Sequence, residues 1–284
     1  MGELEYILLF GLFHSVTYLV FSLGFSLVFG VARLPNLAYG SLYVLSSYLA
    51  HALSSYAGLE MYWAVPTAVL LAGAVSLVVG ELVVKPALKM PVSVFITTMA
   101  VAYIVEEVLN MLMGLRPVVL SLYPGTSSIL GIAVSNHWLL VVGVCILMVI
   151  SLTIFLLRTS TGRAIRAVAE SWEESMRLGI DPLRVLRVTF LVTGIYAGVT
   201  GVLLAPLKAM TPSAGWSPLF AAFAIVVLGG VGNLIGTVVA SVIYGLLEQA
   251  VVYFLGGGIA RVVPLLIVVL TLVVRPQGLL GRGE

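Results

Sequence analysis

The sequence predicts an all-α membrane protein, a polytopic bundle of eight or nine transmembrane helices without a soluble domain. Two observations predict this class. The 284 residues are 61% hydrophobic and 9% charged, whereas a soluble globular domain carries roughly 25% charged residues. Apolar runs of about 20 residues, the length that crosses the hydrocarbon core of a bilayer, recur along the chain. We therefore expect one transmembrane domain over residues 1–284.

Nine apolar runs are assigned as spans. The N-terminus lacks the basic region of a cleaved signal peptide, so the first span is expected to start at Leu4. This run is long enough to tilt or to include an interfacial stretch. The seventh and ninth runs are short and interrupted by Gly or Pro, so eight complete spans with a half-helix is the alternative. The runs are 4–32, 37–57, 62–84, 92–115, 138–157, 188–206, 216–232, 233–255 and 259–274.

The distribution of Lys and Arg predicts the orientation, because cytoplasmic loops carry an excess of these residues. With the N-terminus outside, eleven of the 14 basic residues fall on the inner face and three on the outer face. The sequence thus predicts an outer N-terminus, a cytoplasmic C-terminus and a cytoplasmic loop at 158–187. The inner set is Arg33, Lys85, Lys89, the six arginines of this loop, Arg275 and Arg282, and the outer set is Arg116, Lys208 and Arg261.

The loop 158–187 is the one strongly hydrophilic stretch of the chain, with six of the 14 basic residues and four of the 12 acids. The residues that typically begin and end helices occur within this loop, so the sequence predicts helices there. Thr161 is placed to cap a helix that starts at the next residue, and Gly179 is a typical C-terminal stop. Asp181 followed by Pro182 predicts the cap and first residue of the next helix. We expect an ordered loop that faces the cytoplasm.

The first helix of this loop has a polar face and an apolar face, read from residues spaced i, i+3, i+4 and i+7. An ion pair between Glu173 and Arg177 is also expected. Three roles fit such a helix: docking in a groove of a soluble partner, lying on anionic lipid headgroups, or serving only as a positively charged topogenic loop. The polar set is Arg163, Arg166, Ala167 and Glu170, and the apolar stripe is Ile165, Ala169, Trp172 and Met176.

Glu106, Glu107 and Glu248 lie well inside predicted spans, where an ionised carboxylate is costly and usually faces a bundle interior or a watery cavity. Glu106 and Glu107 are neighbours. Because adjacent helical residues point about 100° apart, the two are not expected to face lipid together. Glu248 lies in the eighth run. These groups form either a polar lining for a solute, including a contact for an ammonium group, or structural hydrogen bonds between helices.

Gly229, Gly230 and Gly232 interrupt an apolar region just before a new span. Glycines at such a position favour two structures equally. One is a break in the helix that exposes backbone polar groups to a solute. The other is close packing between two helices.

Several chemical signatures are absent from the sequence. No G-x-x-x-x-G-K-[ST] pattern occurs, so the chain has no P-loop for ATP. No Ser/His/Asp array or dinucleotide fingerprint is present, and His14 and His51 have no partners at metal-ligand spacing. We expect a non-catalytic chain without a metal, a cofactor or a nucleic-acid partner.

Four stretches of the chain each carry a short sequence motif. From the N-terminus to the C-terminus they are FGVARLPNLAYGSLYVLSSYLA, GRAIRAVAESWEESMRLGIDPLRVLRVTFLVTGIYAGVTGVLLAP, AFAIVVLGGVGNLIGTVVASVIYGLLEQ and RPQGLLG. The first contains N-x-A-x-G, the second G-R-A-x-R-A-x-A and L-G-I, the third V-x-G-G-x-G-x-x-x-G, and the last R-P-Q-G-L-x-G. Together they resemble the permeases of branched-chain amino-acid ABC importers, the LivH/LivM type. The resemblance covers most of the chain.

This resemblance implies an ABC importer permease fold, with a loop helix that seats in a cleft of an ATP-binding subunit. Tyr39 stands where the family usually has His, which leaves the solute open. Trp172 replaces a common small polar residue and is expected to adjust the fit to the ATPase. The coupling residues implied are Gly162, Arg163, Ala164, Arg166, Ala167, Glu170, Gly179 and Ile180. Candidates for the translocation path are Asn36, Tyr39, Glu106, Glu107, Gly229, Gly230, Gly232 and Glu248.

The resemblance also implies a multi-pass protein of the cytoplasmic (inner) membrane with defined partners. These are membrane lipid, a second permease of the LivM type, two ATPases of the LivG/LivF type that bind the ATP, and an extracytoplasmic solute-binding protein. Alternating access would then import branched-chain or similar small amino acids, with urea or short amides as the alternative solutes. A second class is an ion-coupled secondary transporter that uses the buried glutamates. A third is a scaffold without a solute path.

Overall fold

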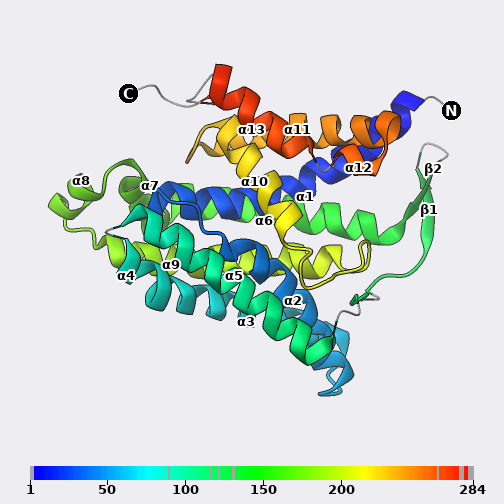
Figure 1. The fold of residues 1–284 in the computed structure, drawn as a ribbon, viewed down its shortest axis with the longest axis horizontal. Coiled ribbons are helices and arrows are strands. Elements are labelled where there is room, and N and C mark those ends of the chain that lie inside the picture. The colour runs from blue at the N-terminus through cyan, green and yellow to red at the C-terminus, as the bar shows by residue number, and fades with distance from the viewer. Residues whose placement is uncertain are drawn as a thin grey trace.

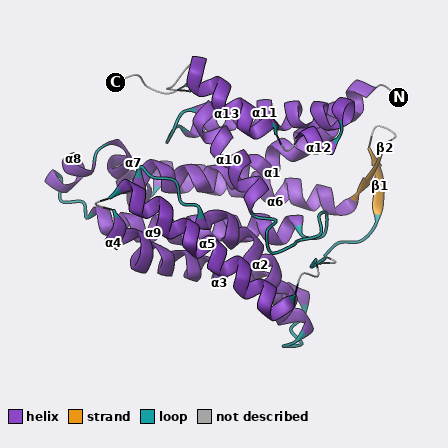
Figure 2. Cartoon of the chain, viewed as in Figure 1, coloured by secondary structure: helices purple, strands orange, loops and turns teal. Residues whose placement is uncertain are grey.

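The computed structural model describes residues 3–88, 90–114, 117–120, 122–129, 132–260, 262–274 and 278–280. Most of the long helices run roughly along the longest axis of the molecule (Figure 1). One end carries α4 (Lys85–Ala87), α7 (Ser160–Glu170) and α8 (Trp172–Arg177). The opposite end carries the N-terminus and a short β-hairpin. Helix dominates the part of the chain that is described (Figure 2).

The helix α1 (Glu3–Ala32) lies in the core of the bundle and is buried over most of its length. It packs against α9 (Pro182–Leu204) and α11 (Leu234–Leu255). The contact with α11 is close, since a Cβ on Gly245 would lie 2.6 Å from the backbone nitrogen of Ser15. Because lipid tails are as apolar as leucine, small residues that allow such approach stabilise helix pairs in membranes.

Two serines hydrogen-bond α9 to its other neighbours, α2 (Ala38–Ser55) and α3 (Met61–Val79). Ser46 Oγ of α2 donates to the backbone oxygen of Gly198 at 2.9 Å. Ser76 Oγ of α3 donates to the backbone oxygen of Phe190 at 2.6 Å. Interhelical hydrogen bonds of this kind contribute about 0.6–2 kcal/mol in membrane proteins.

The third predicted span is longer than expected. α3 continues through a π-helical turn, η1 (Gly80–Val84), into α4, so the helix ends at Ala87 and not at the predicted Val84. Ion pairs support this extension: Glu81 accepts hydrogen bonds from Lys85, at 3.0 Å, and from Arg187 of α9. The added turn therefore lies at the end of the molecule that carries the hydrophilic loop.

The chain is helical in nearly all of its described elements, and one short segment between α5 (Pro91–Met113) and α6 (Asn136–Arg158) adds a hairpin that the sequence did not predict. There β1 (Thr126–Ile129) pairs antiparallel with β2 (Ile132–Ser135), with Thr126 opposite Ser135. Thr, Ile and Val have high strand propensity, and this short run lies outside the long apolar spans. α5 and α6 themselves lie at the periphery and expose most of their residues.

Within the described ranges, six helices are long and apolar enough to cross a bilayer. They are α1, the continuous helix Met61–Ala87, α5, α6, α9 and α11. The other predicted runs also form helices, but α10 (Trp216–Gly229) and α13 (Val263–Val274) have 14 and 12 residues. α2 contains five serines among its 18 residues. The count of eight or nine complete spans therefore stays a prediction.

The N-terminus and the loop 158–187 lie at opposite ends of the bundle (Figure 1), and the orientation in the membrane stays a prediction. α12 (Gly257–Ala260) also lies near the N-terminal end. Part of the charge distribution used for that orientation, and the start of the C-terminal R-P-Q-G-L-x-G pattern, fall outside the described residues. These are Lys89, Arg116, Arg261, 275–277 and Arg282.

Candidate functional sites in a loop and a cavity

The first helix of the hydrophilic loop, α7, begins two residues earlier than predicted. Thr159, and not Thr161, is the N-cap of α7, and its side chain accepts a hydrogen bond from the backbone nitrogen of Gly162 at 2.9 Å. Thr159 has an extended backbone, whereas Thr161 already lies in the first helical turn. The α6–α7 corner is tight, because a Cβ on Gly162 would lie 2.5 Å from the Cα of Leu156.

The predicted continuous helix is broken at Ser171. This residue is extended (φ −158°, ψ 122°) and its side chain accepts from the backbone nitrogen of Glu174 at 3.2 Å, so it caps the separate helix α8. The other predicted boundaries are confirmed. Gly179 follows α8 with φ 77°. Asp181 caps α9 by accepting from the backbone nitrogen of Leu183 at 2.9 Å, with Pro182 in the first turn.

Two hydrogen bonds hold this loop against the end of α1. Trp172 Nε1 donates to the backbone oxygen of Val31 at 2.7 Å. The guanidinium of Arg33, whose backbone is left-handed (φ 54°), donates to the backbone oxygen of Glu170 at 2.7 Å. The loop is thus attached to the chain's own central helix.

The eight coupling candidates are divided between the surface and the interior. Gly162 is buried against α6, and Ala164, Ala167 and Ile180 are half-buried. Arg163, Arg166, Glu170 and Gly179 are exposed. The residues of the predicted polar face thus lie side by side on α7, with only Ala167 partly covered.

The break at Ser171 changes the predicted apolar stripe and ion pair. Ile165 is buried, but Met176 is 54% exposed because it lies on the reoriented helix α8. Arg177 pairs with Glu174, at 2.8 Å, and not with the predicted Glu173. Sequence reasoning also missed Leu178, which is 77% exposed and follows Met176 closely at the tip of the loop. The signal for it was present, since two large apolar residues frame Arg177 within a hydrophilic stretch.

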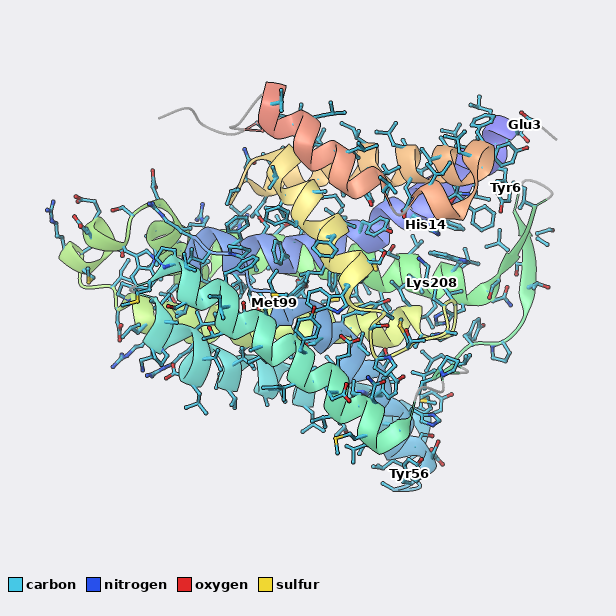
Figure 3. The ribbon with its side chains drawn as sticks, in the orientation of Figure 1. Glu3, Tyr6, His14, Tyr56, Met99 and Lys208 are labelled. Carbon is cyan, nitrogen blue, oxygen red and sulfur yellow. The ribbon has the colours of Figure 1, made fainter. Side chains whose placement is uncertain are left out.

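A cavity of about 470 Å³ opens between α1, α2, the start of α6 and the segment 204–218. Its walls are rich in aromatic rings, from Tyr18, Phe21, Tyr43, Trp138 and Trp216. Lys208 is the one Lys, Arg, Asp or Glu among the described lining residues, and it is exposed. Lys208 and His14, another lining residue, are labelled in Figure 3.

Glu248 of α11 lies directly behind this wall. Tyr18 Oη donates to Glu248 Oε1 at 2.9 Å, and His14 Nδ1 lies 4.0 Å from Glu248 Oε2. Tyr244 packs edge-on against the ring of Tyr18, with centroids 5.0 Å apart. The predicted carboxylate is therefore connected to the cavity through two side chains of α1.

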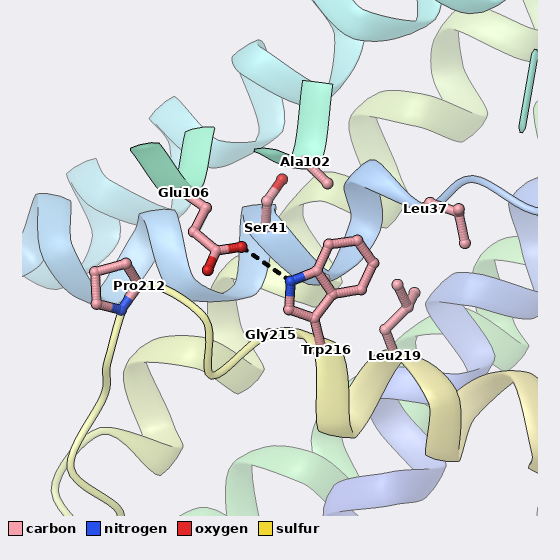
Figure 4. Close-up of a pocket in the computed structure, with 9 residues that line it drawn as sticks. Leu37, Ser41, Ala102, Glu106, Pro212, Gly215, Trp216 and Leu219 are labelled. Carbon is pink, nitrogen blue, oxygen red and sulfur yellow. Dashed lines mark hydrogen bonds between the residues drawn. The ribbon is translucent and has the colours of Figure 1, made fainter. Parts of the chain in front are cut away.

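Glu106 and Glu107 have different surroundings. Glu106 accepts a hydrogen bond from Trp216 Nε1 at 2.9 Å in a small pocket beside Ser41 (Figure 4). Glu107 is exposed on the other side of α5, where Asn110 Nδ2 donates to it at 3.4 Å. The expectation that the two do not face the same way is confirmed. Only Glu106 is joined, through Trp216, to a wall of the large cavity.

Asn36 and Tyr39 do not line either pocket. Both are buried: Asn36 Oδ1 accepts from the backbone nitrogen of Ala38 at 3.1 Å. Tyr39 Oη donates to the backbone oxygen of Phe21 at 2.9 Å. The Asn36 bond is local to the start of α2, whereas the Tyr39 bond holds α2 against α1 and reaches the cavity only indirectly through Phe21.

The glycines 229, 230 and 232 lie at the junction of α10 and α11, away from the cavity. The close-packing alternative is realised, and the chain also turns here, but the turn exposes no backbone group to either described pocket. Gly230 (φ 97°) and Gly232 (φ 75°) end α10 and turn the chain. Gly229 packs so closely on α11 that its Cβ would lie 2.7 Å from the backbone nitrogen of Thr237. They form a tight corner and line neither described pocket.

Sequence reasoning missed most of the cavity wall: Tyr18, Phe21, Tyr43, Trp138, Lys208 and Trp216. Lys208 carried a weak signal, as a lone cation beside an apolar span. No group of three His, Cys, Asp or Glu side chains that suits a metal ion occurs in the part of the chain that is described.

A family model described as "Branched-chain amino acid transport system / permease component" matches residues 7–272. The chain is 27% identical to the high-affinity branched-chain amino acid transport system permease protein LivH of Salmonella typhimurium, over 94% of this chain and 92% of that protein. It is 28% identical to the corresponding permease protein LivM of the same organism, over 94% of this chain and 68% of that protein.

Among solved structures, PsaBC from Streptococcus pneumoniae in complex with Fab is similar to this chain. The TM-score is 0.55 at 11% identity, and the superposition covers 95% of this chain and 92% of that chain. At this identity the likeness concerns the fold alone.

Proposed function

The chain belongs to the family of branched-chain amino acid transport permease components, and we propose that it is the transmembrane permease subunit of an ABC importer. Its solute is a branched-chain amino acid or a similar small, apolar zwitterion. The family match over residues 7–272 and the names of the LivH and LivM relatives support this solute class. The subunit is non-catalytic, and ATP is bound and hydrolysed by partner subunits.

The protein resides in the cytoplasmic membrane with its N-terminus outside and its C-terminus inside. Six apolar helices support a multi-pass chain. The excess of Lys and Arg on one face supports the orientation, as does the position of the loop 158–187 at the end opposite the N-terminus.

The loop transmits the motion of the ATPases. The exposed face of α7, with Arg163, Arg166 and Glu170, is the surface that meets an ATP-binding subunit. Met176 and Leu178 add apolar area to the same loop. When ATP closes the ATPase pair, the loop moves with it and alternating access follows in the helices. The attachment of the loop to Val31 is the single observation that carries this mechanism, since it joins the loop to a helix that lines the cavity.

The complete importer contains a second permease, two ATPases and an extracytoplasmic solute-binding protein. The similarity of this chain to both LivH and LivM of one organism supports a pair of related permeases. The solute-binding protein would deliver the solute at the outer end of the bundle.

Purification of the tagged full chain from its native membrane in mild detergent, followed by mass spectrometry, tests this assembly. We expect Walker-motif ATPases and a second apolar permease in stoichiometric amounts. Glu248, half-buried behind the cavity wall, is the feature that favours the rival ion-coupled transporter. Recovery of the chain alone, able to move leucine in liposomes on an ion gradient without ATP, would contradict the ABC importer and support that rival.

A further inference from the structure

We propose that the cavity beside α1 is a binding site for a zwitterionic α-amino acid, in which Lys208 binds the carboxylate and Tyr18, backed by Glu248, binds the ammonium group. The inference deepens the proposed function, on which it rests for the solute class. It assigns the recognition of each end of the solute to residues of this chain.

Lys208 is the anion-binding group. It is exposed at the cavity and is the one Lys, Arg, Asp or Glu in the described lining. None of the ion pairs formed among the described residues includes it. A cation without a close anionic partner in an otherwise aromatic wall favours a solute that brings a carboxylate, because a charge-assisted hydrogen bond is about twice as strong as a neutral one.

Tyr18 and Glu248 form the part of the site that binds the ammonium group. The hydroxyl of Tyr18 donates a hydrogen bond to Glu248 Oε1 at 2.9 Å. The lone pairs of Oη therefore remain free to accept a hydrogen bond from an ammonium group in the cavity. The carboxylate behind the ring makes this oxygen a better acceptor, because hydrogen bonds in a chain polarise one another.

Unsatisfied polar atoms gather at the same place. His14 Nδ1, Tyr244 Oη and Glu248 Oε2 are buried and have no hydrogen-bond partner among the described residues. All three belong to side chains that surround Tyr18. Buried polar atoms are nearly always paired in native proteins, so a group of three indicates a polar region behind the cavity wall that water completes.

The remaining wall suits an apolar side chain. Phe21, Trp138, Leu204 and Trp216 contribute rings and aliphatic surface. The volume of about 470 Å³ lies within the range of about 300–1,000 Å³ that is typical of small-molecule sites. Aromatic faces also attract an ammonium group, which adds to the contact with Tyr18.

Equilibrium binding of radiolabelled L-leucine to the full chain in lipid nanodiscs tests the assignment. Two competitors separate the charged ends: isocaproate lacks the ammonium group of leucine, and isoamylamine lacks the carboxylate. We expect saturable leucine binding, with each competitor weaker than leucine by at least about tenfold, since each loses a charge-assisted contact.

Each substitution should weaken only the compounds that carry the charged group which the substituted residue binds. Lys208→Gln should weaken leucine at least about tenfold and leave isoamylamine unchanged, and Lys208→Arg should restore leucine. Glu248→Gln should weaken leucine and isoamylamine and leave isocaproate unchanged. Lys85→Gln and Glu60→Gln, which alter charges away from the cavity, are the matched controls and should bind all three compounds like the unmodified chain.

Two results of the binding experiment would overturn the assignment: absence of saturable leucine binding, or a parallel loss of all three compounds in Lys208→Gln with no rescue by Lys208→Arg. The proposed function is tested separately by ATP-dependent uptake in the assembled transporter. Uptake with unchanged discrimination in Lys208→Gln would refute the site and leave the function intact. Binding with the expected discrimination but without ATP-dependent uptake would refute the proposed function and leave the binding site intact.

Discussion

The indole Nε1 of Trp172 donates a hydrogen bond of 2.7 Å to the backbone oxygen of Val31. Carbonyls in the last turn of a helix have no partner within the helix, so this bond satisfies a group that α1 leaves open. It also joins α8 to the helix that carries His14, Tyr18 and Phe21 into the cavity wall. The loop and the cavity wall are thus connected through one helix, α1.

Trp172→Phe should therefore weaken the coupling between ATP hydrolysis and uptake. Phe keeps most of the ring packing but lacks the donor, and the loss of a buried hydrogen bond costs about 1–3 kcal/mol. We expect ATPase activity of the complex to persist while leucine uptake per ATP falls several-fold. Trp63→Phe, at an exposed position on α3, is the matched control. An unchanged uptake-to-ATP ratio in Trp172→Phe would show that this hydrogen bond does not couple ATP hydrolysis to uptake.

The exposed face of α7 predicts a stronger uncoupling effect. Arg163→Glu reverses a charge on this face, and Ala167→Glu adds a bulky charge beside it. Both should abolish most ATP-driven uptake while membrane insertion and yield stay normal, as measured by proteoliposome transport and fluorescence-detected size-exclusion chromatography. Normal transport in both variants would place the ATPase contact elsewhere.

The α10–α11 corner predicts a stability effect. A Cβ on Gly236 would lie 3.1 Å from the Cα of Gly229 and closer still to its carbonyl group. Gly236→Ala should therefore destabilise the fold by about 1–3 kcal/mol, the usual cost of overpacking. Gly143→Ala is the control, because its Cβ would meet nothing within 4 Å and alanine favours a helix. Equal melting midpoints for the two variants would contradict the described contact.

The orientation can be measured with single cysteines, since the one native cysteine, Cys145, is buried. Tyr56 is 75% exposed at the turn after α2, at the end opposite α8 (Figure 3). A membrane-impermeant maleimide should label Tyr56→Cys in intact cells. It should label Glu173→Cys, on the exposed face of α8, only after permeabilisation. The reverse pattern would invert the topology.

Local features of the loop could be predicted from sequence because they depend on neighbouring residues. Asp181-Pro182 and Gly179 marked the helix ends correctly. The prediction of Thr161 as the cap was wrong because a second threonine, Thr159, precedes it by two residues and residue type alone does not distinguish them. The deciding factor was where α6 ends, and that depends on tertiary packing.

The cavity could not be predicted in the same way. Its wall is assembled from α1, α2, α6, α9 and α10. In a membrane helix the buried and lipid-facing surfaces are both apolar, so hydrophobic periodicity does not reveal which face points inward. Adjacent Glu106 and Glu107 illustrate the limit: their spacing predicts different directions, but only the packing of α5 against α2 selects Glu106 as the inner one.

The central claim is that ATP drives an apolar amino acid through this chain by way of the loop. Its most direct test is uptake of radiolabelled leucine by the purified complex in proteoliposomes, with ATP on the side of the α7–α8 loop and no ion gradient. We predict concentrative uptake that requires hydrolysable ATP and disappears in Arg163→Glu. Equal uptake without ATP, or uptake that follows an imposed proton or sodium gradient, would contradict the account.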